Sequence, residues 1–70
     1  MSINLKVIVN GNEKEFSKGI TLQALLEELA LTGKVMAAAV NMDIVKQDSW
    51  AQHVLKEGDK LELLDFVGGG

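Results

Sequence analysis

Residues 60–70 read KLELLDFVGGG, and this stretch decides the fold that we expect. Its first part is rich in leucine, which is typical of a strand in the centre of a sheet. Its last part is three consecutive glycines, which have no side chains and sample φ on both sides of zero. The sequence therefore predicts a folded domain, residues 1–66, followed by a flexible glycine tail, residues 67–70.

Composition limits the possible functions. The chain has 70 residues, enough for one small domain, and a hydrophobic content of 47% can form a core. It contains no cysteine, so it has neither a thiolate nucleophile nor a CxxC redox pair. The net charge of -3 argues against a nucleic-acid partner. No stretch approaches the roughly 20 apolar residues that span a bilayer, so we expect a cytoplasmic protein that has no membrane partner.

The beginning of the chain predicts a hairpin. Residues 3–9 alternate between apolar and polar types, with Ile8 breaking the alternation and facing outward. Asn10-Gly11 is a preferred dipeptide for a type I′ turn, because both central residues of that turn need a positive φ. Residues 12–16 are mostly charged, which favours an edge strand.

A helix is predicted next. Thr21 is a suitable N-cap, and leucines follow from Leu22 to Leu29 at the spacing i, i+3, i+4 and i+7, which gives the helix one apolar stripe. Gly33 is placed to end this helix in the left-handed conformation. The leucine stripe needs a sheet face to cover it.

The remaining elements are shorter. Periodicity alone allows either helix or strand for residues 35–40, VMAAAV, and we expect a strand because a valine stands at each end and a turn follows at residues 41–43. A strand at residues 44–45 comes next. Asp48 or Ser49 is expected to cap a short helical turn that carries Trp50 and Val54. Residues 60–66 form the last strand.

These elements predict an α+β fold, in which a mixed five-stranded sheet packs on one main helix. The last strand is expected beside the first strand and parallel to it, in the sheet centre. If Leu61 and Leu63 face the helix, then Leu64 and Phe66 share the open sheet face with Ile8. Such an apolar patch is typical of a partner docking site. The alternative is a bulge after Leu63 that returns Leu64 to the core.

The last residue carries the chemistry that we expect. A carboxylate is unreactive in water, but an acyl-adenylate formed with ATP makes its carbonyl electrophilic, so that a sulfur or nitrogen nucleophile can displace AMP. The alternative is that the terminal glycines are only a frayed end.

Other candidate sites are weaker. His53 is the only histidine and has no cysteines around it, so we expect no metal site. Trp50 is expected to pack over the edge between the helix and the sheet rather than to stack on a ligand. The glycines lack the following Lys-Ser/Thr of a phosphate-binding loop. We therefore expect no catalytic residues, no cofactor and no enzyme activity.

Together these pieces resemble the thiamine-biosynthesis sulfur carrier family, ThiS-type proteins of the ubiquitin-like β-grasp fold. The resemblance covers essentially the whole chain and rests on the order and spacing of Asn10-Gly11, Thr21-Leu22, Leu25-Leu26, Ala39-Val40-Asn41, Ile44-Val45, Trp50-Ala51-Gln52-His53, Gly58-Asp59 and Phe66-Val67-Gly68-Gly69-Gly70.

The resemblance implies a function. Gly70 would be adenylated by an E1-like, ThiF-type enzyme and converted to a thiocarboxylate, whose sulfur is delivered to a ThiG-type thiazole synthase. Gly68 and Gly69 would form the narrow tail that enters the partner's active site, and the free carrier would be a monomer. The alternatives are a sulfur carrier for molybdopterin or amino-acid synthesis, a conjugated ubiquitin-like modifier, and a non-covalent interaction module.

Overall fold

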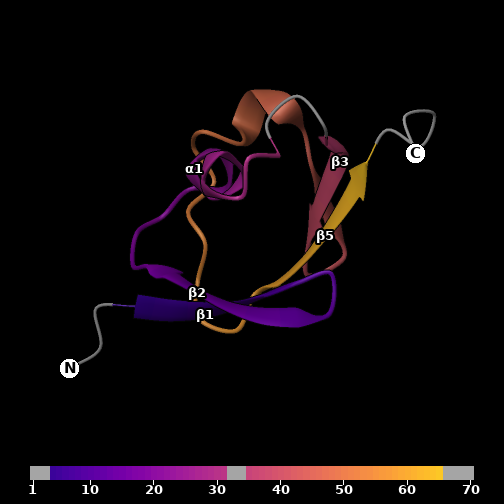
Figure 1. Ribbon diagram of the computed structural model, residues 1–70. Coiled ribbons are helices and arrows are strands. Elements are labelled where there is room, and N and C mark those ends of the chain that lie inside the picture. The colour runs from indigo at the N-terminus through magenta and orange to yellow at the C-terminus, as the bar shows by residue number, and fades with distance from the viewer. Residues whose placement is uncertain (1–3, 32–34, 66–70) are drawn as a thin grey trace.

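The computed structural model describes residues 4–31 and 35–65, apart from the side chains of Met36 and Asp65. Within these residues the chain forms one sheet of five strands in the order β2-β1-β5-β3-β4, with a helix on one face (Figure 1). The elements are β1 (Asn4–Val9), β2 (Asn12–Ser17), α1 (Leu22–Glu28), β3 (Val35–Val40), β4 (Asp43–Val45), the 3-10 helix η1 (Gln47–Ser49) and β5 (Lys60–Asp65).

The strand order confirms the predicted architecture. β5 lies between β1 and β3, parallel to the first and antiparallel to the second, so the sheet is mixed. The charged strand β2 is at one edge, as its sequence predicts. The ambiguous run VMAAAV is the strand β3. No helix in the described part of the chain is long and apolar enough to cross a membrane.

Two hairpin turns hold the central strand. Asn10 and Gly11 have φ angles of 49° and 88°, as the type I′ prediction requires. The Asn10 side-chain oxygen also accepts a 2.8 Å hydrogen bond from the backbone N–H of Leu63. The turn between β3 and β4 makes the same kind of contact: the side-chain oxygen of Asn41 accepts a 3.0 Å hydrogen bond from the backbone N–H of Lys60. Both turns therefore bond to β5.

The helix begins as predicted and ends earlier. The Thr21 hydroxyl accepts a 3.1 Å hydrogen bond from the backbone N–H of Ala24, which caps the first turn. The prediction that Gly33 ends the helix is wrong, since α1 ends at Glu28 and the left-handed residue is Ala30, with φ 58°. Gly33 itself lies outside the described residues.

A Schellman motif explains this early end. The backbone N–H of Leu31 donates to the carbonyl of Leu26 at 2.8 Å, and that of Ala30 donates to Glu27 at 3.0 Å. Leu31 packs against the core through this motif. The contact of the partly buried Leu31 with the core works against the cost of placing an alanine in a conformation that glycine adopts more easily.

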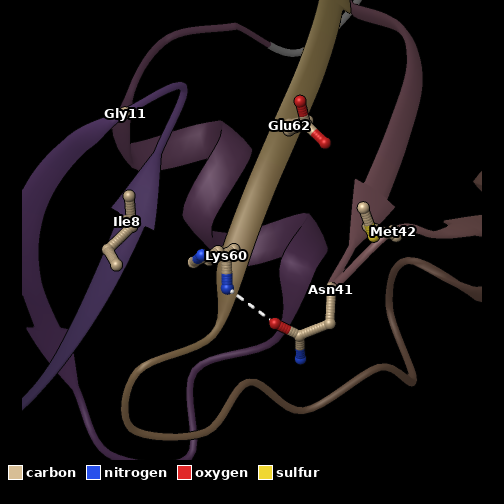
Figure 2. A pocket seen from close by; sticks show the side chains of 6 residues that line it. All are labelled: Ile8, Gly11, Asn41, Met42, Lys60 and Glu62. Atoms are coloured by element: carbon tan, nitrogen blue, oxygen red, sulfur yellow. Dashed lines mark hydrogen bonds between the residues drawn. The ribbon is translucent and has the colours of Figure 1, made fainter.

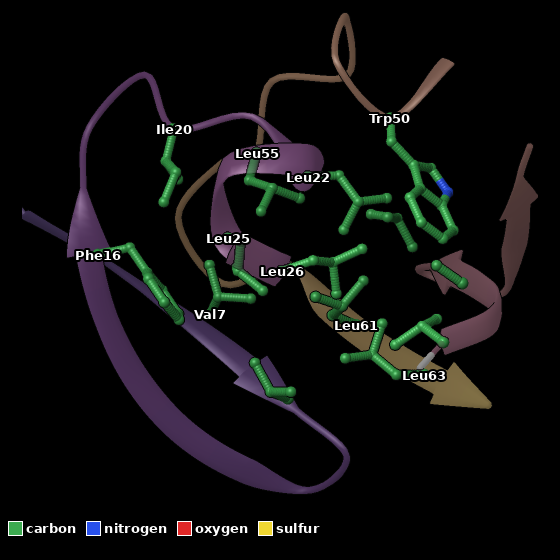
Figure 3. Packing of buried hydrophobic residues seen from close by; sticks show 14 of the residues in the cluster. Val7, Phe16, Ile20, Leu22, Leu25, Leu26, Trp50, Leu55, Leu61 and Leu63 are labelled. Atoms are coloured by element: carbon green, nitrogen blue, oxygen red, sulfur yellow. The ribbon is translucent and has the colours of Figure 1, made fainter. Parts of the chain in front are cut away.

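The core lies between α1 and the inner face of the sheet (Figure 3). Leu22, Leu25 and Leu26 of the helix are fully buried against apolar side chains of β1, β3 and β5. Trp50 closes one side of this core with 2% exposure, and its indole N–H donates a 2.8 Å hydrogen bond to the carbonyl of Val45. The predicted packing role of Trp50 is confirmed.

The predicted helical turn differs in detail. Asp48 and Ser49 lie inside η1 and do not cap it; the cap is Lys46, whose side chain makes no capping bond. The turn is closed instead by backbone bonds, including one of 2.8 Å from Ser49 N–H to the Lys46 carbonyl. Val54 is not part of η1: it pairs with Thr21 in an isolated bridge and is 51% exposed.

Candidate functional site

The open face of the sheet is the candidate docking site. Along β5, Leu61 and Leu63 are buried, whereas Lys60, Glu62 and Leu64 are exposed on the opposite side. Leu64 is 59% exposed, so no bulge after Leu63 returns it to the core. The irregularity lies in β3 instead, between Val35 and Ala37, and leaves Ala37 opposite Leu64.

This face contains two neighbouring hollows. The first lies between β1 and the β3–β4 turn, with β5 as its floor (Figure 2), and is lined by Ile8, Gly11, Asn41, Met42, Lys60 and Glu62. The second lies over β3, β4 and β5 and is lined by Ala37, Ala38, Ala39, Ile44, Glu62 and Leu64. Ile8 and Leu64 share the face, but each belongs to a different hollow. Glu62 borders both hollows.

Two exposed apolar residues on this face were not identified from the sequence. Met42 is 87% exposed and Ile44 is 74% exposed. Ile44 lies directly opposite Ala39 in the β3–β4 ladder, and Ala39 lies opposite Glu62 in the β3–β5 ladder. The outward position of Ile44 follows from which alanines of β3 face the core. The run VMAAAV does not specify these faces, because all its residues are apolar.

The β3–β4 turn is fixed by a buried carboxylate. Asp59 is 9% exposed and its two oxygens have separate partners. Oδ1 accepts a 3.0 Å hydrogen bond from the Asn41 side-chain amide, and Oδ2 accepts one of 2.8 Å from the backbone N–H of Lys56. Asn41 is therefore held through both its side-chain amide and its side-chain oxygen, and the turn has a defined position next to the first hollow.

The carboxylate of Glu62 is the charge at the boundary between the two hollows. It is exposed, and no hydrogen bond or ion pair within residues 4–31 and 35–65 engages it. The cation on its own strand is Lys60, two residues away on the same face. A protein that covers the two hollows therefore also covers Glu62.

The described residues show no metal-binding cluster. No group of three or more His, Cys, Asp or Glu residues among them could hold a metal ion. His53 is half-buried, and its carbonyl accepts a 2.8 Å hydrogen bond from the backbone N–H of Leu22. Its backbone thus helps to position the start of α1.

Four residues of the predicted site lie outside the described residues. They are Phe66, which is one of the three predicted docking residues, and the three terminal glycines Gly68, Gly69 and Gly70. In the sequence they follow β5 directly, so the central strand of the sheet leads into the predicted tail.

A mixed five-stranded sheet with one helix across one face defines a ubiquitin-like β-grasp protein. The crystal structure of the thiamine biosynthesis protein ThiS from Geobacter metallireducens has this fold. It matches with a TM-score of 0.79 at 24% sequence identity, covering 94% of this chain and 100% of that chain.

Sequence comparisons identify the family. The model of the ThiS family matches residues 7–70. The sulfur carrier protein ThiS of Escherichia coli is 32% identical over 66 residues, which are 94% of this chain and 100% of that protein. A thiazole synthase of Paramagnetospirillum magneticum is 42% identical over 66 residues, and there the match spans only 20% of the longer protein. The chain belongs to the ThiS family.

Proposed function

We propose that this chain is a sulfur carrier protein of thiamine biosynthesis, and that it carries sulfur as a thiocarboxylate on Gly70. The observation that carries this proposal is the match over the full length of the Escherichia coli sulfur carrier, together with the ThiS family model. In this proposal residues 1–66 are the cytoplasmic docking domain and residues 67–70 are a flexible tail. The chain itself is not an enzyme.

The chemistry takes place on the tail in two steps. An oxygen of the Gly70 carboxylate attacks the α-phosphorus of ATP, and pyrophosphate leaves to give an acyl-adenylate. A hydrosulfide ion then attacks the acyl carbon and AMP leaves with the bonding electron pair, so that loss of the sulfur-bound proton gives the thiocarboxylate. Gly68 and Gly69 have no side chains, so they suit a narrow entrance to a partner's active site.

Two partners follow from this sequence of reactions. A ThiF-type adenylating enzyme supplies the activation, and a thiazole synthase receives the sulfur. The second partner is supported by the thiazole synthase of Paramagnetospirillum magneticum, which contains a segment related to this chain within its own sequence. We propose that docking uses the open sheet face, with Ile8, Leu64 and Phe66 as contacts.

Intact-mass measurement tests the function. The protein is incubated with a ThiF-type enzyme, ATP and a sulfur donor, and its mass is expected to increase by the exchange of one oxygen for sulfur. Fragmentation is expected to place that change at Gly70. A variant that lacks Gly69 and Gly70 is the control, because it has the same docking face and a shortened tail. An unchanged mass for the full chain in the presence of all three components would reject the proposal.

A further inference from the structure

The β3–β4 turn places a methionine in an unfavourable backbone conformation. Met42 has a φ of 74°, in the left-handed region that is an outlier for a bulky side chain. The equivalent position of the β1–β2 turn is Gly11, which adopts a φ of 88° without a Cβ penalty. A glycine at position 42 would therefore suit the turn better than the methionine does.

Packing within the domain does not offset this cost. The Met42 side chain is 87% exposed, so it gains little from burial. The turn is held by its neighbour, because Asn41 bonds to both Asp59 and the backbone of Lys60. This network fixes the backbone of the turn and leaves the Met42 side chain at the rim of the first hollow (Figure 2). Strained residues of this kind cluster at binding and catalytic sites.

We propose that Met42 is a contact residue of the docking face, and that it inserts into an apolar recess of thiazole synthase beside a cationic side chain that pairs with Glu62. This inference rests on the proposed function and adds two residues to its docking contacts. Methionine suits such a role, because its unbranched thioether chain adapts to irregular apolar surfaces.

The charge on this face defines the chemistry of the partner. Glu62 lies between the first hollow, where Ile8 and Met42 are the apolar side chains, and the second hollow, whose other lining side chains are all apolar. No ion pair within the described ranges engages its carboxylate. Covering that carboxylate without a counter-charge would be costly, since burial removes its hydration. The complementary surface is therefore apolar and carries an arginine or lysine opposite Glu62.

The relatives favour thiazole synthase as the occupant. In the Paramagnetospirillum magneticum thiazole synthase, a segment 42% identical to this chain is covalently part of the longer protein. Covalent linkage of the two modules holds them at high effective concentration and is useful where they act on each other. A direct contact between the open sheet face of the carrier and the thiazole synthase agrees with this covalent linkage.

Glycine substitutions give a test in which stability and binding change in opposite directions. Met42→Gly relieves the positive φ, so we expect the midpoint of thermal unfolding to rise by on the order of 4 °C. The same variant is expected to bind the thiazole synthase of the same organism about tenfold more weakly in calorimetric titration, because the apolar contact is lost. Met42→Leu keeps an apolar side chain and is expected to bind within about threefold of the wild-type chain.

Ala30→Gly is the matched control for the backbone effect. Ala30 also has a positive φ, follows the end of α1, and lines neither of the two hollows. This variant is expected to become more stable in the same way and to bind with unchanged affinity.

A second pair of variants tests the charge. Glu62→Lys is expected to weaken binding to thiazole synthase by about tenfold, whereas Glu28→Lys at the end of α1 is expected to leave it unchanged.

Each result has a clear meaning. If Met42→Gly binds thiazole synthase as tightly as the wild-type chain, the role of Met42 is wrong, and if Glu62→Lys does so, the counter-charge is wrong. If the wild-type chain acquires the thiocarboxylate but shows no binding to thiazole synthase, the choice of partner is wrong while the carrier function stands. Self-association that Met42→Gly abolishes in analytical ultracentrifugation would assign the face to a second copy and also overturn the proposal.

Discussion

The side-chain amide of Asn41 donates a 3.0 Å hydrogen bond to the carboxylate of Asp59, and this contact joins the β3–β4 turn to the loop before β5. The same carboxylate accepts a hydrogen bond from the backbone of Lys56 within that loop. Asp59 is thus the point at which two segments 18 residues apart meet. Its removal should loosen the turn and the start of the central strand together.

Asp59→Ala is expected to lower the free energy of unfolding by about 2 kcal/mol, because two donors lose a charged acceptor. Urea denaturation followed by circular dichroism measures the change. Asp48→Ala is the matched control, since Asp48 is an exposed aspartate in η1, and we expect a change below about 0.5 kcal/mol. Equal effects of the two substitutions would show that the Asp59 contacts contribute no stability.

Asn10→Ala is expected to cost about 2 kcal/mol, for two separable reasons. Alanine tolerates the positive φ of this position less well than asparagine, and it cannot accept the hydrogen bond from Leu63. Asn10→Gly restores the backbone freedom without the acceptor, so the difference between the two variants measures the backbone part. Asn12→Ala in the exposed strand β2 is the control and should leave the free energy of unfolding nearly unchanged. Urea denaturation measures all three variants, and an Asn10→Ala variant as stable as Asn12→Ala would contradict the role of Asn10.

Trp50→Phe is expected to destabilise the domain by about 2 kcal/mol. The phenyl ring leaves part of a fully packed site empty, and the carbonyl of Val45 loses the indole N–H. Calorimetric unfolding is the suitable measurement, because the chain has one tryptophan and the variant loses that fluorescence signal. The exposed neighbour Gln52→Ala serves as the control and should unfold like the wild-type chain; a Trp50→Phe curve that coincides with it would contradict the packing role.

Ile44→Asp is expected to weaken docking to thiazole synthase about tenfold while changing the free energy of unfolding by less than about 1 kcal/mol. Ile44 is 74% exposed and lines the second hollow, so its side chain matters to a partner more than to the core. Val54→Asp is the matched control, because Val54 is also exposed and lines neither hollow of the open face. Titration calorimetry should separate the two variants, and identical affinities would remove Ile44 from the docking face.

Local signals in the sequence predicted most of the fold. The alternation in β1, the Asn10-Gly11 turn and the charged strand β2 each depend on residues close together in the chain. The leucines of β5 indicated a central strand. The structure buries Leu61 and Leu63 against the helix and leaves Leu64 exposed on the open face. The resemblance to the ThiS family added the fold name and the carrier function, which short patterns do not specify.

The sequence could not predict features that depend on long-range packing. The helix pattern continued to Leu29 and a glycine followed at position 33, yet α1 ends at Glu28 in a Schellman motif, with Leu31 partly buried against the core. The outward face of Ile44 became recognisable only when the register between β3, β4 and β5 was known. A turn with methionine in a left-handed conformation also has no common sequence signal, because glycine and asparagine dominate such positions.

The position of β5 also matters mechanically. Ladders on both sides hold this strand, and asparagine side chains from two separate turns bond to its backbone. A pull along the chain beyond Asp65 would load these ladders in shear, so that many bonds resist together, whereas an edge strand would peel away bond by bond. Under the proposed function, a partner enzyme that pulls on the predicted glycine tail would therefore be resisted by the whole sheet.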